Sequence, residues 1–205
     1  MVSQRRKSVE GAEPPRAANA IPEERILDAA YALLIAVGMG RLNMADLARQ
    51  ADISRATLYR RWPNVQAVLS ALLTREFAEV TARAGGASMG GGRAGVVRTV
   101  VSIVGELRVH PLLRKIIEVD PDFLIPYLLQ RRGSSSDTQL ALIETGVLAG
   151  QADGSVRAGD AQMLACAVLL SAWSFTLTGP VFVPKRRYPA LDAELSELID
   201  RYLAP

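Results

Sequence analysis

The chain has 205 residues, of which 49% are hydrophobic and only 5% aromatic, enough for one compact unit or two small ones with an aliphatic core. Its single cysteine, Cys166, excludes an internal disulfide and a Cys-rich zinc site, and its single histidine, His110, argues against a multi-histidine metal site or a Ser-His-Asp hydrolase. The net charge of +3 comes from residues 1–83, with 12 basic and 9 acidic side chains, whereas residues 84–205 carry 12 of each. An excess confined to one half of the chain is typical of a protein that binds a polyanion.

Residues 1–20 are polar, contain Pro14-Pro15, and are predicted to form a disordered tail. The basic side chains of the tail are either solvated or reach DNA phosphates or a minor groove: Arg5, Arg6, Lys7 and Arg16. The tail lacks the apolar run of a secretory signal, so we expect a cytoplasmic location.

The first predicted helix begins at Pro22, which fits a first helical turn, and Glu23 and Glu24 favour the positive end of its dipole. Gly38 ends this helix. Apolar residues at spacings of three and four predict one buried stripe: Ile26, Ala29, Ala30, Leu33, Leu34 and Val37. The helix is expected to brace the two short helices that follow.

Residues 43–62, NMADLARQADISRATLYRRW, predict two short helices joined by a tight turn. Asn43 is suited to cap the first helix, with Asp46 placed to complete a capping box, and Ser54 is suited to cap the second. Asp52 falls in the turn, where a positive φ is often needed and Asp tolerates it. Two helices joined in this way form a helix-turn-helix, whose second helix enters the major groove of DNA.

The second short helix ends early because Pro63 disfavours helical geometry at Trp62. Residues 41–62 contain two acidic and five basic side chains, and the basic ones are all arginines: Arg41, Arg49, Arg55, Arg60 and Arg61. Arginine pairs bidentately with guanine edges and with phosphates. A solvated helical hairpin with ordinary surface arginines is the alternative, and the caps, the turn and the arginines together favour DNA binding.

The segment from about Ile21 to Val80 resembles the DNA-binding domain of the TetR family of bacterial transcriptional regulators. The matching pieces are IL-x-AA-x-x-L from Ile26, Gly38, the D-L-A of the second helix, I-S-x-x-T-L-Y-R from Ile53, and Trp62-Pro63-Asn64. Three residues depart from the family pattern: Asn43 replaces a Thr, Asp52 replaces the Gly of the turn, and Val65 replaces a Lys that often contacts a phosphate. That phosphate contact is therefore expected to be missing.

The resemblance implies a homodimer that binds a palindromic double-stranded DNA operator through its third helix, usually as a repressor. It implies an all-α fold of about nine helices, with a tail over 1–20, a DNA-binding domain over 21–81 and an effector-binding and dimerisation domain over 82–205. The residues expected at the DNA are Asn43, Arg55, Ala56, Thr57, Tyr59, Arg60 and Arg61. Among them, Arg55 and Thr57 are candidates for base edges and the last three for phosphates, whereas Trp62 is expected in the core.

Asn64 is suited to cap a long fourth helix that runs to about Arg83. In the following stretch Gly90, Gly92 and Gly95 match G-x-G-x-x-G, but no strand pattern precedes them, which favours a loop between helices over a dinucleotide site. Apolar periodicity predicts further helices over 94–109, 112–119, 121–129 and 140–150, and the polar stretch 131–137 is expected to interrupt or loosen them.

The most apolar segment, 160–178, is shorter than the ~20 residues of a membrane span and is interpreted as a buried helix. A last helix over 190–203 carries one apolar stripe: Leu191, Leu195, Leu198, Ile199 and Tyr202. These two helices are predicted to form a four-helix interface between two copies of the chain; closure of the monomer's own core is the alternative.

A small, mainly apolar effector is expected between helices four to eight. Its candidate contacts are His110, Phe123, Tyr127, Met163, Cys166 and Trp173, each of which could equally serve ordinary core packing. No cofactor is predicted, and neither a metal-spaced cluster nor a catalytic set stands out. The alternative is a helical small-molecule-binding protein or enzyme whose helix pair is not used on DNA; a membrane-surface protein is disfavoured because no basic amphipathic helix is present.

Overall fold

The computed structural model describes residues 23–86, 91–119 and 134–205. Within these ranges all regular structure is helical, with ten α-helices, two 3-10 turns and no strand, which confirms the predicted all-α fold. The predicted tail over 1–20 and the helix expected from Pro121 lie outside the described residues. None of the helices in these ranges is long and apolar enough to cross a membrane.

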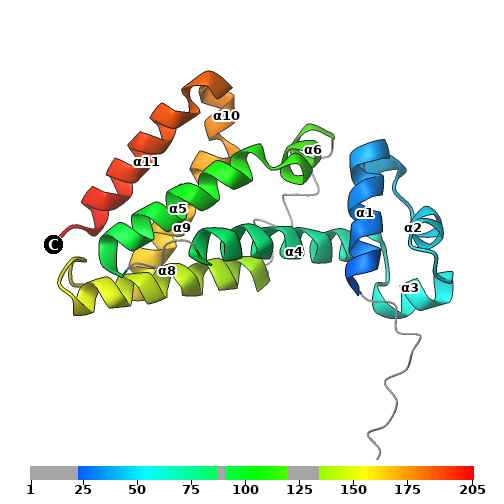
Figure 1. Ribbon diagram of the computed structural model, residues 1–205, viewed down its shortest axis with the longest axis horizontal. Coiled ribbons are helices and arrows are strands. Elements are labelled where there is room, and N and C mark those ends of the chain that lie inside the picture. Colours follow the sequence, from blue (N-terminus) through cyan, green and yellow to red (C-terminus); the bar gives the residue numbers. More distant parts are fainter. Residues whose placement is uncertain (1–22, 87–90, 120–133) are drawn as a thin grey trace, which may run out of the picture.

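The first three helices gather at one end of the molecule, at the right of Figure 1. Helix α1 ends at Gly38, whose φ of 76° lets the chain turn sharply. Most of the predicted stripe of α1 is buried, but Val37 is 44% exposed because it borders a surface cleft between α1 and α2 instead of the core. The elements of this group are α1 (Glu23–Val37), η1 (Met39–Arg41), α2 (Met44–Gln50) and α3 (Arg55–Arg61).

Helix α4 (Val65–Gly86) leads from this group along α5 (Gly92–Val109) and α8 (Ser134–Ala152). Its 22 residues extend over roughly 33 Å at the usual rise of an α-helix. The side chain of Asn64 caps it by accepting a hydrogen bond from the N–H of Ala67 at 2.9 Å. One continuous apolar cluster joins α1–α3 through Phe77 and Val80 of α4 to residues of α5 and α6. Helices α1–α3 and the central helices therefore share a core.

Helix α5 (Gly92–Val109) lies at the centre of the remaining helices and contacts α4, α8, α9 and α11. A second buried cluster fills the space between α5, α8, α9 and α11, with Val104, Ile143, Val168 and Leu195 among its members. The other elements are α6 (Pro111–Val119), α8 (Ser134–Ala152), α9 (Ala161–Leu177), α10 (Gly179–Phe182), η3 (Lys185–Arg187) and α11 (Tyr188–Leu203).

Gly92 of the nucleotide-like pattern belongs to a close packing contact at the start of α5, whereas Gly90 lies outside the described residues. Gly92 has a φ of 78°, and a Cβ at this position would lie 2.5 Å from side-chain atoms of both Asp153 and Ser155. The hydroxyl oxygen of Ser155 accepts a hydrogen bond from the N–H of Arg93 at 3.0 Å. The glycine at position 92 therefore serves the packing of the start of α5 against the turn after α8.

Two predicted details of the later helices need adjustment. The prediction of an interruption over 131–137 is wrong for its second half, because α8 already begins at Ser134, with Asp137 near its positive end. The apolar stripe of α11 is divided: Leu195, Ile199 and Leu203 are buried, whereas Leu198 and Tyr202 are 46% and 37% exposed.

Candidate nucleic-acid interface

The start of α2 is held by its predicted cap. The side-chain oxygen of Asn43 accepts hydrogen bonds from the N–H groups of Ala45 and Asp46 at 3.0 and 2.9 Å. The Asn43 amide nitrogen donates to the Asp46 carboxylate at 2.7 Å, and this carboxylate also pairs with Arg49. Both polar atoms of Asn43 are thus engaged within the first turn of α2, so its local role is to fix where this helix begins.

The turn between α2 and α3 has the geometry that its residues predict. Asp52 adopts a φ of 54°, the only positive φ of a non-glycine residue in the described chain. The N–H of Ile53 then donates to the carbonyl of Ala48 at 2.9 Å, which satisfies a carbonyl at the end of α2. The carboxylate of Asp52 lies 3.3 Å from the guanidinium of Arg25, so the turn is also tied to α1.

Helix α3 begins with a second cap. The Ser54 hydroxyl oxygen accepts a hydrogen bond from the N–H of Thr57 at 3.1 Å and lies 2.8 Å from the Thr57 hydroxyl. Leu58 is the fully buried residue of α3, and Trp62 just after it is 7% exposed, so the expectation that Trp62 belongs to the core is confirmed. Together these residues fix one face of α3 to the protein.

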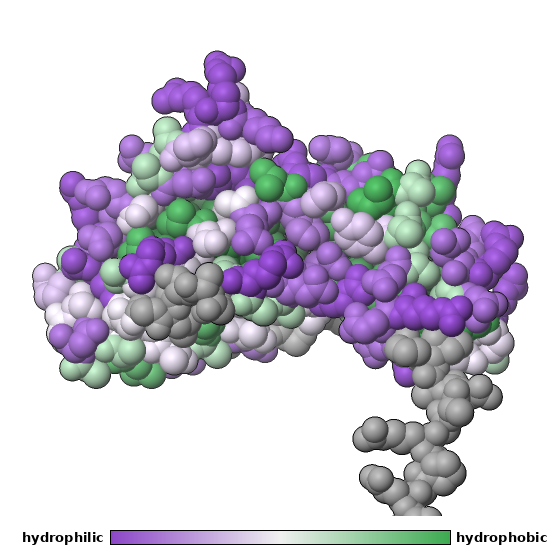
Figure 2. Space-filling model, in the orientation of Figure 1, coloured by the Kyte–Doolittle hydropathy of each residue, from purple (hydrophilic) through white to green (hydrophobic). Residues whose placement is uncertain are grey.

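The opposite face of α3 is open to solvent. Arg55, Ala56, Tyr59 and Arg60 are exposed there and, at spacings of one and four, share one side of the helix. Arg61 is exposed as well and lies over the ring of Trp62 at 5.7 Å, whereas Thr57 is half-buried. Helix α3 contains no acidic residue. At this end of the molecule Figure 2 shows hydrophilic side chains along the outer and lower edge, with a hydrophobic area above them. Six of the seven residues predicted at the DNA therefore belong to one exposed, basic helix.

An exposed arginine-bearing helix, capped and supported by a second helix behind a tight turn, defines a helix-turn-helix protein of the DNA-binding class. Residues 26–72 match the model of the bacterial regulatory proteins of the tetR family. Over 179 residues the chain is 31% identical to an uncharacterized HTH-type transcriptional regulator of Mycobacterium tuberculosis, with 87% of this chain and 93% of that protein covered. The chain belongs to the TetR family, and it is a transcriptional regulator and not an enzyme.

Two further comparisons agree with this assignment. The HTH-type transcriptional regulator AqdR of Rhodococcus erythropolis is 47% identical over 58 residues, 28% of each chain. The structure of the R. erythropolis repressor QsdR, of the TetR family, matches with a TM-score of 0.66 at 20% identity, and covers 88% of this chain and 93% of that chain. The fold is thus shared over nearly the whole length.

The predicted effector contacts fall in different places. Trp173 of α9 lines a cavity between α5, α8 and α9, and its ring meets Phe77 of α4 edge-on with centroids 5.6 Å apart. Cys166 is half-buried and Met163 is 62% exposed, and neither lines this cavity. Phe123 and Tyr127 lie outside the described residues. Two polar lining residues, Thr99 and Gln139, were not singled out from the sequence, because nothing in their neighbours along the chain marks them.

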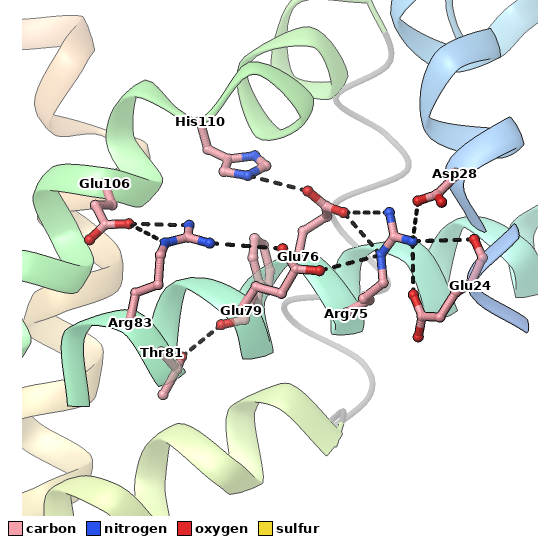
Figure 3. A network of polar contacts seen from close by, with 10 residues as sticks. Glu24, Asp28, Arg75, Glu76, Glu79, Thr81, Arg83, Glu106 and His110 are labelled. Atoms are coloured by element: carbon pink, nitrogen blue, oxygen red, sulfur yellow. Dashed lines mark hydrogen bonds and ion pairs between the residues drawn. The ribbon is translucent and has the colours of Figure 1, made fainter. Parts of the chain in front are cut away.

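A network of charged side chains joins α1, α4 and α5 (Figure 3). Arg75 of α4 contacts carboxylates of Glu24 at 3.1 Å and Asp28 at 2.7 Å, both in α1, and of its neighbour Glu76 at 2.8 Å. The other carboxylate oxygen of Glu76 lies 3.5 Å from Nε2 of His110, the residue between α5 and α6. Burial lowers the pKa of His110, and this outweighs the opposite effect of Glu76. His110 therefore belongs to the contact between α4 and the corner that joins α5 to α6.

Proposed function

We propose that the protein is a dimeric repressor that binds a palindromic operator through α3 and leaves it when a small, mainly apolar effector binds between the later helices. The exposed, basic face of α3 is the observation that carries this proposal. In a two-fold dimer, the two copies of α3 enter successive major grooves, with half-sites about one turn (~34–36 Å) or a larger dimer-set spacing apart.

The position of each side chain along α3 suggests its role at the DNA. Arg55 lies at the first residue of the helix, where side chains reach base edges, and Thr57 is two residues further on. Tyr59, Arg60 and Arg61 lie toward its end and are assigned to phosphates, which set register without specifying sequence. Asn43 and Ala56 complete the contact surface. Val65, half-buried at the start of α4, supplies no charge at the position where the TetR pattern often has a Lys.

The partner in the dimer is a second copy of the chain, held through α9 and α11. In the single chain Met163 and Leu170 of α9 are 62% and 71% exposed. They lie seven residues apart and therefore on the same side of the helix. Leu198 and Tyr202 of α11 are also exposed, and α11 contacts α9. Apolar side chains gathered on neighbouring helices are typical of a surface that another chain covers.

The first test is binding of the purified protein to DNA that flanks its own gene, measured by fluorescence anisotropy across a salt series. Saturable binding by a dimer, with strong preference over unrelated DNA and a steep loss of affinity with salt, is the expected result. The double variant Arg55→Ala and Arg60→Ala should lose this binding while keeping its helical circular dichroism spectrum. Arg186→Ala, an exposed arginine of η3, is the matched control. Full binding by the double variant would refute the role of α3.

A further inference from the structure

The cavity between α5, α8 and α9 has an apolar wall with a small polar part. Its free space is about 380 Å³ when its open mouth is included, but the centre of a water molecule can occupy only about 30 Å³ of it. Among the described residues, its lining includes no charged side chain. Leu142, Leu169 and Trp173 are only half-buried, so they are the lining residues that the fold encloses least. A ligand of any size must displace some of them.

Three lining residues are polar, and they differ in whether their polar groups have a hydrogen-bond partner. The hydroxyl of Thr176 donates to the carbonyl of Ala172 at 2.8 Å, four residues before it in α9. Thr81 of α4 makes the same kind of bond. The hydroxyl of Thr99 and the amide nitrogen of Gln139, in residues only 3% and 4% exposed, have no hydrogen-bond partner among the described residues. Buried polar groups in folded proteins nearly always have a partner, so this pair needs an explanation.

We propose that this cavity, which Thr99 and Gln139 both line, binds an uncharged, largely hydrocarbon molecule with one carbonyl oxygen that accepts a hydrogen bond from Gln139 Nε2. The proposal rests on the proposed function, since this molecule is the effector. The amide nitrogen of Gln139 can only donate, which requires an acceptor on the ligand. The described part of the lining offers no charge to balance a buried carboxylate or ammonium group, which favours an uncharged ligand.

A side-chain contact links this cavity to the helix that leads to the DNA-binding helices. Trp173 lines it on one side and packs edge-on against Phe77 of α4 on the other. Phe77 is 1% exposed, and buried side chains are closely packed, so we expect a displaced Trp173 to press on it. A ligand that displaces Trp173 shifts α4, and α4 leads directly to α3.

The unpartnered state of the two residues is tested first, without any ligand. Thr99→Val and Gln139→Leu keep the shape of the side chains and remove groups that have no partner, so the melting temperature should stay or rise. Thr176→Val is the matched control, because it removes a hydroxyl that does have a partner, and it should lower the melting temperature. A clear loss of stability in Thr99→Val and Gln139→Leu would overturn the proposal.

The ligand class is tested on the full chain with chain-length series of six to twelve carbons: methyl ketones, the matching carboxylates and the matching alkylamines. At least one ketone should raise the melting temperature, and its affinity should fall about tenfold in Gln139→Leu, as expected for one lost hydrogen bond. Equal binding of a charged series, no loss in Gln139→Leu, or no binding of any ketone would overturn the inference. Operator binding without any probe is measured in parallel, and if it persists, the failure concerns the ligand class and leaves the proposed DNA binding standing.

Discussion

The guanidinium of Arg75 lies 2.7 Å from the carboxylate of Asp28, and this contact joins α4 to α1 across 47 positions of the chain. The side chain of Arg75 is only 14% exposed, and its neighbour Glu76 is 9% exposed. Arg75 is thus the shared cation of a cluster of carboxylates at the junction between the DNA-binding helices and the helix that leads to the rest of the molecule.

We expect Arg75→Met to lower the free energy of unfolding by about 2–3 kcal/mol, because it leaves the buried carboxylate of Glu76 without its cation. Urea denaturation measures this change. Arg83→Met is the matched control: Arg83 is 55% exposed and pairs with Glu106 at 3.2 Å, so its loss should cost no more than about 1 kcal/mol. Equal losses in the two variants would contradict the view that burial makes the Arg75 cluster important.

The protein should become less stable as the pH falls below about 6.5, the ordinary pKa of histidine. Burial lowers the pKa of His110 in the folded state, and the charges that face it are those of Glu76, Arg83, Glu79 and Glu106. As the pH falls, His110 takes up a proton more readily in the unfolded chain than in the folded one. The stability is therefore fully present above pH 6.5 and is lost as the pH falls toward the pKa of His110 in the folded state.

This pH dependence is measured by urea denaturation at a series of pH values between 7 and 5. His110 is the only histidine, so His110→Gln should flatten the curve over the upper part of this range. A wild-type protein that gains stability on acidification would show that attraction by Glu76 outweighs burial, and would reverse our interpretation.

Asp52→Ala should destabilise the protein by about 1–2 kcal/mol, because alanine is strained at the φ of 54° that the turn imposes. Asp52→Gly removes the same exposed ion pair with Arg25 but tolerates this φ, so it is the control that isolates backbone strain. Thermal denaturation of the two variants gives the comparison. If they melt at the same temperature, the positive φ contributes nothing to the stability of the turn.

Arg55 and Arg60 should differ in what they contribute to operator binding. Arg55→Ala should cost about 1–3 kcal/mol on the operator and relax the preference at one base pair, since it removes a base contact. Arg60→Ala should weaken binding to all sequences alike and reduce the salt slope by about one, since it removes a phosphate contact. Anisotropy titrations on the operator and on single-substitution operators distinguish them. The reverse pattern would exchange the two assignments.

Leu170→Lys should convert the dimer into a monomer, because it places a charge within the apolar surface that we assign to the dimer. Light scattering coupled to size-exclusion chromatography gives the mass. Ile35→Lys, in α1 and 37% exposed, is the control and should leave the dimer intact. The lysine at 170 should also weaken operator binding, since two linked half-sites bind together. A dimeric Leu170→Lys protein would exclude α9 from the interface.

The sequence by itself determined the helix-turn-helix in detail. Asn43 and Ser54 cap helices by bonding groups two or three residues away, and Asp52 turns the chain through its own φ. Interactions of this range depend on the order of residues alone, so a local pattern predicts them. The all-α class followed for the same reason, because apolar spacing reveals a helix wherever it lies.

Only the tertiary structure decided which side chains meet. Arg75 finds Asp28, and Thr99 and Gln139 face one cavity from two helices, although nothing near them in the chain distinguishes them from ordinary helical residues. Likewise the stripe of α11 reads as one apolar face, yet Ile199 is buried and Leu198 is exposed. Burial and hydrogen bonding of such residues depend on helices that come from distant parts of the chain, and the packing of those helices sets which polar groups keep a partner and which apolar surface stays open.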